Sequence, residues 1–398
     1  MNENISVIGL GYVGLPLALS AAESGYKVLG LDINQERVKI INMGKSPIED
    51  IADLQIVNVV KDGSFFASSD FSLLSSSKII LITVPTPLSE IGEPDLDFIT
   101  NAIDLFSPYV AKGSLIILES TVAPGFTRDV FIPMVLSKTK LNENELDFGF
   151  SPERIDPGNN LWNLRTTPKI ISASSERSLN DVYKFYSKFV EVLHRVKCFE
   201  VAETAKLLEN SFRLVNISLA NELMVFCDAL GIEVNEVIMA ASSKPYGFMP
   251  FYPGVGVGGH CIPVDPMYLA HKANEIGTPI KLINLSSSIN LNLPMYFVKK
   301  VSKILGDLKD RKILVIGVAY KPNIRDTRET PVKNLILELR KRGAQVSWHD
   351  ELVKNWNGEE SVPLENKFDL AIVATRHDYM NLTVLGSMPV IDSRRSTL

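Results

Sequence analysis

Short apolar runs recur along the first third of the chain, and each ends in a turn or leads into a helical pattern. Residues 5–8 form a β-branched run, and residues 15–24, beyond a glycine turn, have the composition of a helix. Further strands are predicted over residues 26–31, 78–84 and 114–119. Strands that alternate with helical segments are typical of a parallel sheet covered by helices. We therefore predict an open α/β domain in this part of the chain.

The longest helical pattern in the chain covers residues 202–230 and is closed by Gly231. Apolar residues are dense on most of its faces, which indicates a helix buried between domains rather than one lying on a single domain. Helical composition returns over residues 267–275 and 285–303, and Pro294 marks a start or a kink of the last of these segments.

The last third repeats the arrangement of the first. Residues 312–316 form a β-branched run that is followed by Gly317, a turn-rich segment and a helix over residues 330–342. Two further strands are predicted at 345–348 and 368–374. The predicted fold class is α/β, with two Rossmann-like doubly wound domains joined by a long central helix. The predicted domain boundaries are 1–200, 201–300 and 301–398.

Composition narrows the class of protein. With 398 residues, 45% of them apolar and 22% charged, the chain has room for two or three domains and the balance of a soluble globular protein. The net charge of -5 argues against a nucleic-acid surface. No run approaches the roughly 18 apolar residues that span a bilayer, and the N-terminus lacks the basic region of a signal sequence. We expect a cytoplasmic protein that contacts neither nucleic acid nor membrane.

A glycine turn between the first strand and the first helix predicts a dinucleotide site. Gly9, Gly11 and Gly14 form G-x-G-x-x-G, in which glycines allow a tight turn and the helix N-terminus faces a pyrophosphate. Asp32 ends the second predicted strand, at the spacing where an acid binds the ribose 2′-hydroxyl. Because a carboxylate there repels a 2′-phosphate, NAD is favoured over NADP. The alternative is a glycine turn in an unrelated α/β protein.

Hydroxyl side chains follow two predicted strands, at the edge where parallel sheets bind ligands. Thr86 and Thr121 are candidates to line a nicotinamide pocket, although ordinary strand-end hydroxyls fit equally well.

Lys206 and Asn210 lie one turn apart on the long helix. On a mostly apolar helix, polar side chains are costly to bury unless they have a role or lie at the end of a solvated stripe. Arg213 forms a helical pair with Glu209 that we interpret as structural.

The three cysteines, Cys198, Cys227 and Cys261, are far apart and form no C-x-x-C pair. That pattern favours a reducing compartment and indicates no metal site. Cys261 lies in a loop, residues 252–266, and follows a run of four glycines that is too rich in glycine for a helix or strand interior. We interpret this loop as bare backbone that lies against a ligand and delivers a thiol to it. The alternative for a single cysteine is a small buried apolar side chain.

The second α/β domain lacks G-x-G-x-x-G, so a phosphate there would be held by side chains. Tyr320, Lys321, Arg325 and Arg328 supply suitable donors, and arginine in particular binds phosphate through two hydrogen bonds. In the middle of the chain, Glu153 stands in a proline-rich ordered loop, where a surface carboxylate is the alternative to a functional one. A hydride acceptor and a phosphorylated substrate are therefore predicted.

With these residues in place, the whole chain resembles the NAD-dependent nucleotide-sugar 6-dehydrogenases. Seven ordered motifs carry the resemblance: G-x-G-Y-V-G at residues 9–14, V-P-T-P at 84–87, E-S-T-x-x-P-G at 119–125, S-P-E-R-x-D-P-G at 151–158, A-E-x-A-K-L-x-E-N at 202–210, G-G-H-C-I-P-x-D-P at 258–266, and D-T-R-E at 326–329. Within the group, F-M-P-F-Y-P-G at 248–254 and G-G-H-C-I-P-V-D-P at 258–266 are most similar to the UDP-N-acetylglucosamine 6-dehydrogenases.

The resemblance implies a four-electron oxidation of a sugar C6 hydroxyl to a carboxylate, with two NAD⁺ per sugar, in the synthesis of surface polysaccharide precursors. It implies an NAD-binding domain first, a central region with the catalytic loop and dimer contacts, and a UDP-sugar-binding domain last. Cys261 would capture the aldehyde covalently, and Lys206 and Asn210 would stabilise the oxyanion. Asp265, Thr121 and Glu153 would handle protons and the hydrolytic water.

The resemblance also implies the residues that contact each ligand. The implied NAD contacts are Gly9, Gly11, Tyr12, Val13, Gly14, Asp32, Arg37, Thr86, Thr121 and Arg328. The implied UDP-sugar contacts are Glu153, Arg154, Asp156, Pro157, Lys206, Asn210, Tyr252, Gly254, Gly256, Gly258, Tyr320 and Lys321, with Arg394 and Arg395 near a further substrate position. His260 would shape the loop. Pairing through the central helix implies a homodimer or a larger homo-oligomer.

Three other hypotheses stay open at this point. An ordinary two-electron dehydrogenase of a small hydroxy acid would yield one NADH per substrate and would not need Cys261. A non-catalytic nucleotide-sugar sensor would bind without turnover, against the intact set of reacting groups. UDP-glucose and UDP-N-acetylmannosamine are the alternative substrates.

Overall fold

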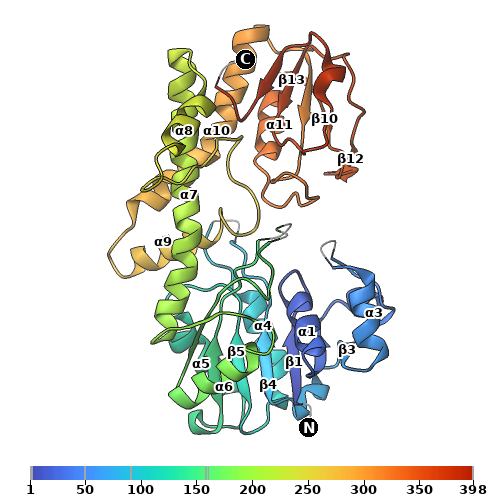
Figure 1. Cartoon of the computed structure of the whole chain (residues 1–398), viewed down its shortest axis with the longest axis vertical. Helices are drawn as coiled ribbons and strands as arrows, with labels where there is room; N and C mark the ends of the chain where they lie inside the picture. Colours follow the sequence, from blue (N-terminus) through green and yellow to red (C-terminus); the bar gives the residue numbers. More distant parts are fainter. Residues whose placement is uncertain (1–2, 49–50, 90–91, 157–158, 160, 397–398) are drawn as a thin grey trace. The chain divides into compact units, whose positions relative to one another are not determined.

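The computed structural model describes residues 3–48, 51–89, 92–156, 159 and 161–396. The chain forms two compact units, Met1–Leu208 and Glu209–Leu398. Helix α7 (Phe199–Leu230; Figure 1) contributes residues to both units. Gly231 follows its last turn with a left-handed φ of 72°. Among the described residues, no helix combines the length and the apolar character that crossing a bilayer requires.

The first unit is built on an eight-stranded sheet in the order β3-β2-β1-β4-β5-β6-β7-β8. The strands are β1 (Asn4–Ile8), β2 (Lys27–Leu31), β3 (Phe65–Ser68), β4 (Ile79–Ile82), β5 (Leu115–Leu118), β6 (Asp147–Phe150), β7 (Lys169–Ala173) and β8 (Leu193–Arg195). The first six are parallel, whereas β7 pairs with β6 in the antiparallel sense. The order of the first six strands is that of dinucleotide-binding domains.

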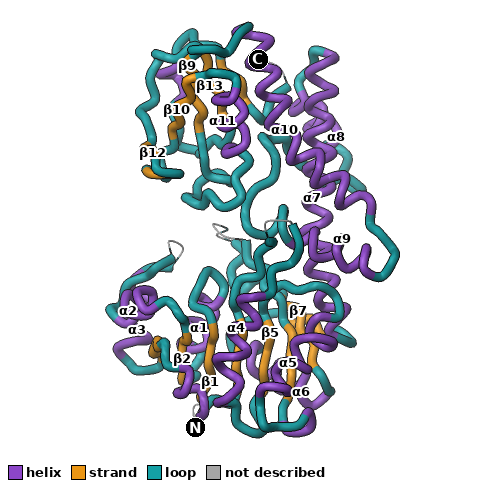
Figure 2. Tube along the Cα trace, turned by 180° about the vertical axis from the view of Figure 1, so that it is seen from behind, coloured by secondary structure: helices purple, strands orange, loops and turns teal. Residues whose placement is uncertain are grey.

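Helices cover both faces of this sheet (Figures 1 and 2). Successive side chains of β4 and β5 alternate between two apolar cores: Ile79 and Leu81 belong to one, and Ile80 and Ile82 to the other. A strand that is buried on both faces is apolar throughout, which is why these strands are recognisable as continuous runs. The helical segments are α1 (Gly14–Glu23), α2 (Gln35–Asn42), α3 (Asp53–Lys61), α4 (Asp97–Phe106), α5 (Ile132–Lys138) and α6 (Glu176–Tyr186), with shorter turns η1 (Phe71–Ser76), η2 (Ser107–Tyr109), η3 (Thr127–Phe131) and η4 (Glu143–Glu145).

The second unit has a four-stranded parallel sheet in the order β10-β9-β13-β14. Its strands are β9 (Lys312–Ile316), β10 (Gln345–His349), β13 (Leu370–Val373) and β14 (Val390–Asp392), with a small hairpin of β11 (Asn355–Trp356) and β12 (Glu359–Glu360). Its helical segments beyond α7 are α8 (Val234–Ser242), α9 (Asp265–Glu275), α10 (Lys281–Leu305), α11 (Val332–Lys341) and η5 (Leu382–Leu385). Ile313 and Val315 of β9 pack on the helical side, and Leu314 and Ile316 on the other.

The predicted fold class is confirmed, with a large mostly parallel sheet and a second α/β unit. The predicted strands coincide with β1, β2, β4, β5, β9, β10 and β13 to within about two residues, whereas β3, β6, β7, β8 and β14 were not predicted. Of these, β3, β8 and β14 are edge strands, which are short and pack on fewer neighbours, so their apolar signal is weak. Pro294 lies inside α10, which begins at Lys281, so it does not mark a helix start.

Each glycine of the first turn has a different structural role. Gly9 has a φ of 93° and donates its N–H to Leu31 O at 2.7 Å. A Cβ on Gly14 would lie 1.8 Å from Gly9 O, so this position requires the missing side chain. A Cβ on Gly11 would meet nothing within 4 Å. The turn therefore needs Gly9 and Gly14 to fold, while Gly11 leaves open space beside the helix N-terminus.

We expect Gly14→Ala to lower the free energy of unfolding by about 2–3 kcal/mol, because a new methyl group would overlap a backbone oxygen. Gly11→Ala is the matched control, in the same turn but with open space, and should change stability by less than about 0.5 kcal/mol. Thermal and chemical denaturation of the two variants checks this. Equal losses would show that packing at Gly14 is not the constraint.

Candidate active site

The turn after β1 is held by the carboxylate that follows β2. Asp32 Oδ2 accepts the Leu10 N–H at 2.8 Å and an Arg37 N–H at 2.9 Å, and Asp32 Oδ1 accepts the Asn34 N–H at 2.8 Å. Asp32 is buried, and Arg37 is half-exposed. The structure thus brings Asp32 and Arg37 to the glycine turn, where Tyr12 is exposed. The open space at Gly11 and an acid at the strand end fit the pyrophosphate and ribose of a dinucleotide.

The loops after β4 and β5 are joined at the same edge of the sheet. Thr86 is buried and Thr121 is half-buried. Ser120 Oγ donates to Val84 O at 2.6 Å and so ties the two loops together. Because β1, β4 and β5 are parallel neighbours, their carboxyl ends and the glycine turn lie along one edge.

A buried charge cluster lies beneath the Glu153 loop. Lys169 Nζ donates to Glu119 Oε2 at 2.8 Å, and the Tyr186 hydroxyl donates to Glu119 Oε1. All three side chains are nearly inaccessible to solvent. Burial raises the pKa of the Glu119 carboxyl in spite of Lys169, and burial together with the Glu119 charge raises the pKa of Tyr186 well above its usual value.

Glu153 is held above this cluster by its own loop. Its Oε1 accepts the N–H groups of Arg154 and Ile155, each at 2.6 Å, and its Oε2 lies 3.9 Å from Lys169 Nζ. Lys169 is therefore shared between two carboxylates, Glu119 and Glu153. Arg154 donates to Pro168 O and is half-buried, so it also braces the loop. Asp156 is half-buried, whereas Pro157 and Gly158 of the same motif lie outside the described residues.

Helix α7 carries four polar side chains, among them two candidate site residues, on one stripe. Positions 203, 206, 210 and 213 are spaced by three and four residues, which places them on one face of a helix. Glu203 accepts the N–H groups of Gly125 at 2.6 Å and Thr127 at 2.9 Å, so it anchors the segment that follows Thr121. Burial raises the pKa of Glu203. Lys206, in the next turn, is buried as well.

The Cys261 segment is fixed by Asp265 and Asn210. The Asp265 N–H donates to Cys261 O at 2.8 Å, in the turn that leads into α9. Asn210 Nδ2 donates to Asp265 Oδ2 at 2.6 Å, and both side chains are buried. Cys261 itself is exposed, so the alternative of a small buried apolar side chain does not hold for it, whereas it does hold for Cys227. The structure thus brings Asn210, Asp265 and the Cys261 loop together.

The glycines of this loop make room mainly for protein atoms. A Cβ on Gly258 would lie 2.7 Å from Tyr320 Cβ, and a Cβ on Gly259 would lie 2.7 Å from the Tyr320 ring. Gly254 donates its N–H to Asn221 Oδ1 at 3.0 Å, from α7. The close approach predicted from the sequence is present, but at Gly258 and Gly259 the group that approaches is Tyr320.

A cavity of about 240 Å³ lies in the second unit. Six predicted substrate contacts line it: Tyr252, Gly254, Gly256, Gly258, Tyr320 and Lys321. Arg213 and Arg394 also line it, which makes the cavity cationic, whereas Arg395 is exposed and is not among the lining residues. Arg213, interpreted from the sequence as structural, therefore lies at a ligand-sized cavity.

Thr330 is a lining residue that the sequence did not single out. It is buried, and within the described part of the chain its Oγ1 has no hydrogen-bond partner. A ligand hydroxyl or phosphate oxygen in the cavity would satisfy it. Arg328, a predicted NAD contact, is held in the neighbouring segment by Asp326, whose Oδ2 accepts Arg328 Nε at 2.9 Å. No group of three or more metal-ligating side chains gathers anywhere in the described ranges.

Comparison with known proteins covers the chain in three segments. It matches the UDP-glucose/GDP-mannose dehydrogenase family at the NAD binding domain over residues 3–190, the central domain over 200–292 and the UDP binding domain over 314–395. Protein CapL of Staphylococcus aureus is 36% identical, with 98% of this chain and 90% of that protein covered. UDP-N-acetyl-D-glucosamine 6-dehydrogenase of Pseudomonas aeruginosa is 35% identical, with 88% and 83% covered. The solved UDP-D-ManNAc dehydrogenase of Pyrococcus horikoshii has a TM-score of 0.90 at 32% identity, with 98% and 95% covered.

We expect Lys169→Met to lower the free energy of unfolding by about 3–5 kcal/mol, because it leaves the buried Glu119 without its cation. A carboxyl whose pKa is raised in the folded state stabilises that state at low pH and loses this contribution as pH rises. The deficit should therefore shrink between about pH 8 and about pH 5. Denaturation at several pH values measures it.

The control for this prediction is the double variant Lys169→Met/Glu119→Gln, which removes both charges. It should restore at least half of the lost free energy of unfolding, and it should remove most of the pH dependence of the deficit. A deficit that is independent of pH, or that persists in the double variant, would place the effect in packing rather than in charge.

Proposed function

The chain belongs to the UDP-glucose/GDP-mannose dehydrogenase family, and we propose that it oxidises the C6 hydroxyl of a UDP-sugar to the carboxylate. The observation that best supports this proposal is the hydrogen bond of 2.6 Å between Asn210 and Asp265, near the exposed Cys261. Cys261 follows a run of glycines, three of which line a cationic cavity. We assign that cavity to the uridine diphosphate, with Lys321, Arg213 and Arg394 as its cations.

In this proposal the first oxidation removes a hydride from C6 and a proton from its hydroxyl, which gives an aldehyde. The Cys261 thiolate adds to the aldehyde carbon, so that a C–S bond forms and the carbonyl oxygen becomes an oxyanion. Loss of a second hydride from the same carbon gives a thioester. Attack by water then breaks the C–S bond and releases the carboxylate and the thiol. NAD⁺, when bound, supplies the acceptor for each hydride.

The remaining roles follow from charge and hydrogen-bonding capacity. Lys206 and Asn210 stabilise the oxyanion, and removal of such a donor typically slows the reaction by about a hundredfold or more. Asp265 takes up protons. Its carboxylate accepts a hydrogen bond from Asn210, and its backbone N–H donates to Cys261 O, so it is positioned near the thiol. Thr121 and Glu153 position the hydrolytic water. Lys169 Nζ lies 3.9 Å from the Glu153 carboxylate and places a positive charge next to it.

The dinucleotide is assigned to the first unit. The turn of residues 9–14 takes the pyrophosphate, and Asp32 takes the adenosine ribose, with Arg37 beside it. The other NAD contacts proposed from the sequence are Tyr12, Val13, Thr86, Thr121 and Arg328.

For the sugar we propose UDP-N-acetylglucosamine, on the strength of the F-M-P-F-Y-P-G segment at residues 248–254. The similar proteins include one named for N-acetylglucosamine and one named for N-acetylmannosamine, so the epimer at C2 is the point to test. UDP-glucose is the remaining alternative. The acid product would serve as a precursor of surface polysaccharide.

The decisive measurement counts NADH per sugar for four substrates: UDP-N-acetylglucosamine, UDP-N-acetylmannosamine, UDP-N-acetylgalactosamine and UDP-glucose. We expect two NADH per sugar, with the highest kcat/KM for UDP-N-acetylglucosamine. Cys261→Ala should abolish carboxylate formation and leave the UDP-sugar Kd within a few-fold, since the thiol acts only after the first hydride has left.

Cys198→Ala is the matched control, a cysteine of the first unit outside the proposed machinery, and should keep full activity. Undiminished acid production by Cys261→Ala would refute covalent capture. One NADH per sugar would refute the four-electron reaction, and a preference for another sugar would replace the substrate while leaving the reaction intact.

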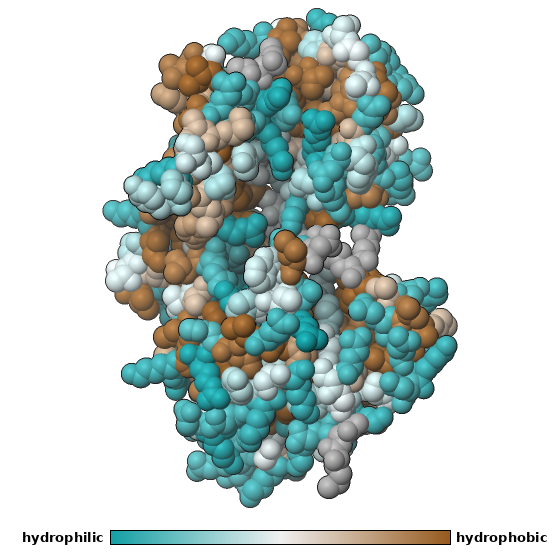
Figure 3. Space-filling view, viewed as in Figure 1, coloured by the Kyte–Doolittle hydropathy of each residue, from teal (hydrophilic) through white to brown (hydrophobic). Residues whose placement is uncertain are grey.

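We also propose that the enzyme is a homodimer that pairs through α7. Phe212, Leu219 and Phe226 are spaced by seven residues on one face of the helix, and each side chain is about half exposed or more. Figure 3 shows hydrophobic side chains at the surface of the region where α7 and α8 lie. Large apolar side chains aligned on one helical face are typical of a buried interface, and family members support a second copy as the occupant.

Accordingly, Leu219→Glu should shift the protein to the monomer, because a charge would be buried in the interface. Light scattering coupled to size exclusion measures the mass. Leu54→Glu, on α3 and with a similar exposed fraction of 67% against 63%, should leave the mass unchanged. A wild-type protein that is monomeric at micromolar concentration would contradict the proposal.

A further inference from the structure

The two units repeat one arrangement of strand, turn and carboxylate. Asp32 follows β2 and accepts the Leu10 N–H, in the turn after β1. Asp350 follows β10 and accepts the Val318 N–H at 2.9 Å, in the turn after β9. Gly9 and Gly317 both have positive φ and donate their N–H groups to the neighbouring strand, to Leu31 O and His349 O. The second unit therefore carries a counterpart of the dinucleotide-binding acid.

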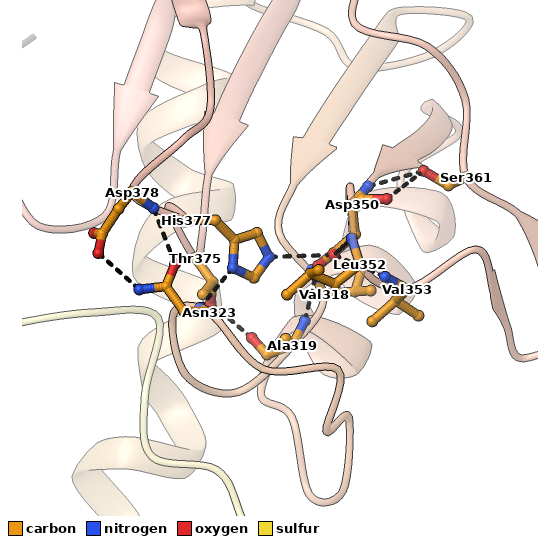
Figure 4. Close-up of polar contacts among 10 residues, drawn as sticks. All are labelled: Val318, Ala319, Asn323, Asp350, Leu352, Val353, Ser361, Thr375, His377 and Asp378. Carbon is orange, nitrogen blue, oxygen red and sulfur yellow. Dashed lines mark hydrogen bonds and ion pairs between the residues drawn. The ribbon is translucent and has the colours of Figure 1, made fainter. Parts of the chain in front are cut away.

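The counterpart acid is fully occupied by protein donors (Figure 4). Asp350 Oδ2 accepts the N–H groups of Val318 and Ala319, and Oδ1 accepts those of Leu352 and Val353 at 2.9 and 3.0 Å, with His377 Nε2 at 3.2 Å. Burial by itself raises the pKa of Asp350, but the hydrogen bonds from His377, Val353 and Val318 outweigh it and lower the pKa to about 2. This carboxylate is 0% exposed and serves the protein rather than a ligand.

His377 links this anion to the loop that lines the cavity. Its Nδ1 accepts the Asn323 N–H at 2.8 Å, so the proton of the neutral ring is on Nε2, which faces Asp350. The ring is completely buried and stacks on Tyr379, with centroids 5.7 Å apart. Asn323 has a left-handed φ of 64°, a conformation that needs support in a residue other than glycine.

Hydrogen bonds hold this loop at both ends of the part that lines the cavity. Asn323 Nδ2 donates to Asp378 Oδ2 at 2.7 Å, and the Asp378 N–H donates to Asn323 Oδ1 at 3.1 Å. At the other end, Thr375 Oγ1 donates to Ala319 O at 2.7 Å. Between these anchors lie Tyr320, Lys321 and Pro322, all three of which line the cavity.

We propose that Asp350, His377 and Asn323 form a positioning relay that holds residues 320–322 in the conformation that binds the uridine diphosphate. The relay rests on the proposed function of the cavity. A loop ordered before binding spares the ligand the entropic cost of ordering it. The turn after β9 has no G-x-G-x-x-G of its own, so the side chains of Tyr320 and Lys321 supply the donors of this turn, and their placement contributes to the affinity.

Two substitutions of His377 separate the two bonds of the relay. The amide of His377→Gln can still donate to Asp350 but leaves the Asn323 N–H without its acceptor. The shorter amide of His377→Asn places an oxygen close to the original Nδ1 and keeps that acceptor. We expect His377→Gln to raise the UDP Kd and the UDP-sugar KM about tenfold, the effect of one lost buried hydrogen bond. The KM for NAD⁺ and kcat should stay within about twofold, and His377→Asn should recover at least half of the lost affinity on a logarithmic scale.

His349→Gln is the matched control, a histidine of the same sheet whose Nδ1 bonds Val362 O at 2.6 Å, away from the cavity. It should lower thermal stability without changing the UDP Kd. If His377→Gln does not fold, Asn323→Gly at an exposed position keeps the left-handed backbone and loses the Asp378 bonds. It should raise the UDP Kd about threefold or more.

The outcomes are distinguishable by calorimetric titration with UDP on the full chain. An unchanged UDP Kd in both His377→Gln and Asn323→Gly overturns the relay, and so does an equal rise in His349→Gln, which would show general destabilisation. A parallel rise in the KM for NAD⁺ overturns it as well. A wild-type protein that binds neither UDP nor a UDP-sugar overturns the proposed function and the relay together.

Discussion

Buried carboxylates that accept backbone N–H groups hold three loops of this protein in place. Asp32, Glu203 and Asp350 each accept two or more such groups, and for each of them at least one comes from a segment that is distant in the sequence. A buried carboxylate without partners is costly, and a loop N–H without an acceptor is costly too. Each pairing removes both costs at once, so the loop has one stable position. The turn after β1, the segment after Thr121 and the turn after β9 are fixed in this way.

The carboxylates nevertheless do different work because their remaining contacts differ. Asp32 keeps an arginine beside it at the edge of the sheet, where a ribose would lie. Asp350 has no capacity left, because His377 and four backbone groups fill its oxygens. Glu119 is paired with Lys169 and Tyr186 in the interior, and it shares that lysine with Glu153. Carboxylate side chains thus serve loop positioning and charge balance, and in the proposed function also the recognition of a ribose.

Helix α7 gives the proposed chemistry its order along the chain. Glu203 anchors the loop that follows Thr121, Lys206 lies one turn on, Asn210 holds Asp265 beside Cys261, and Arg213 reaches the cavity. These residues fall on a single stripe because the helix repeats every 3.6 residues. Along the helix, these four side chains are therefore spaced by about one turn each. In the proposed function they have distinct roles, so substitutions within this stripe should affect distinct steps.

Features that depend on local periodicity and spacing could be predicted from the sequence. The strands buried on both faces, the turn at Gly9–Gly14 with Asp32, the long helix with Lys206 and Asn210, and the loop before Cys261 are all visible in the printed letters. Contacts between side chains that are distant in the sequence, by contrast, depend on the tertiary structure. Lys169 and Tyr186 lie 50 and 67 residues from Glu119, and His377 lies 54 residues from Asn323. Likewise, the sequence indicated that Arg213 is one partner of a helical pair with Glu209, whereas in the structure it lines the cavity. Such partners leave no periodic signal, because the contact between them is created by packing of elements and not by the spacing of residues along one element.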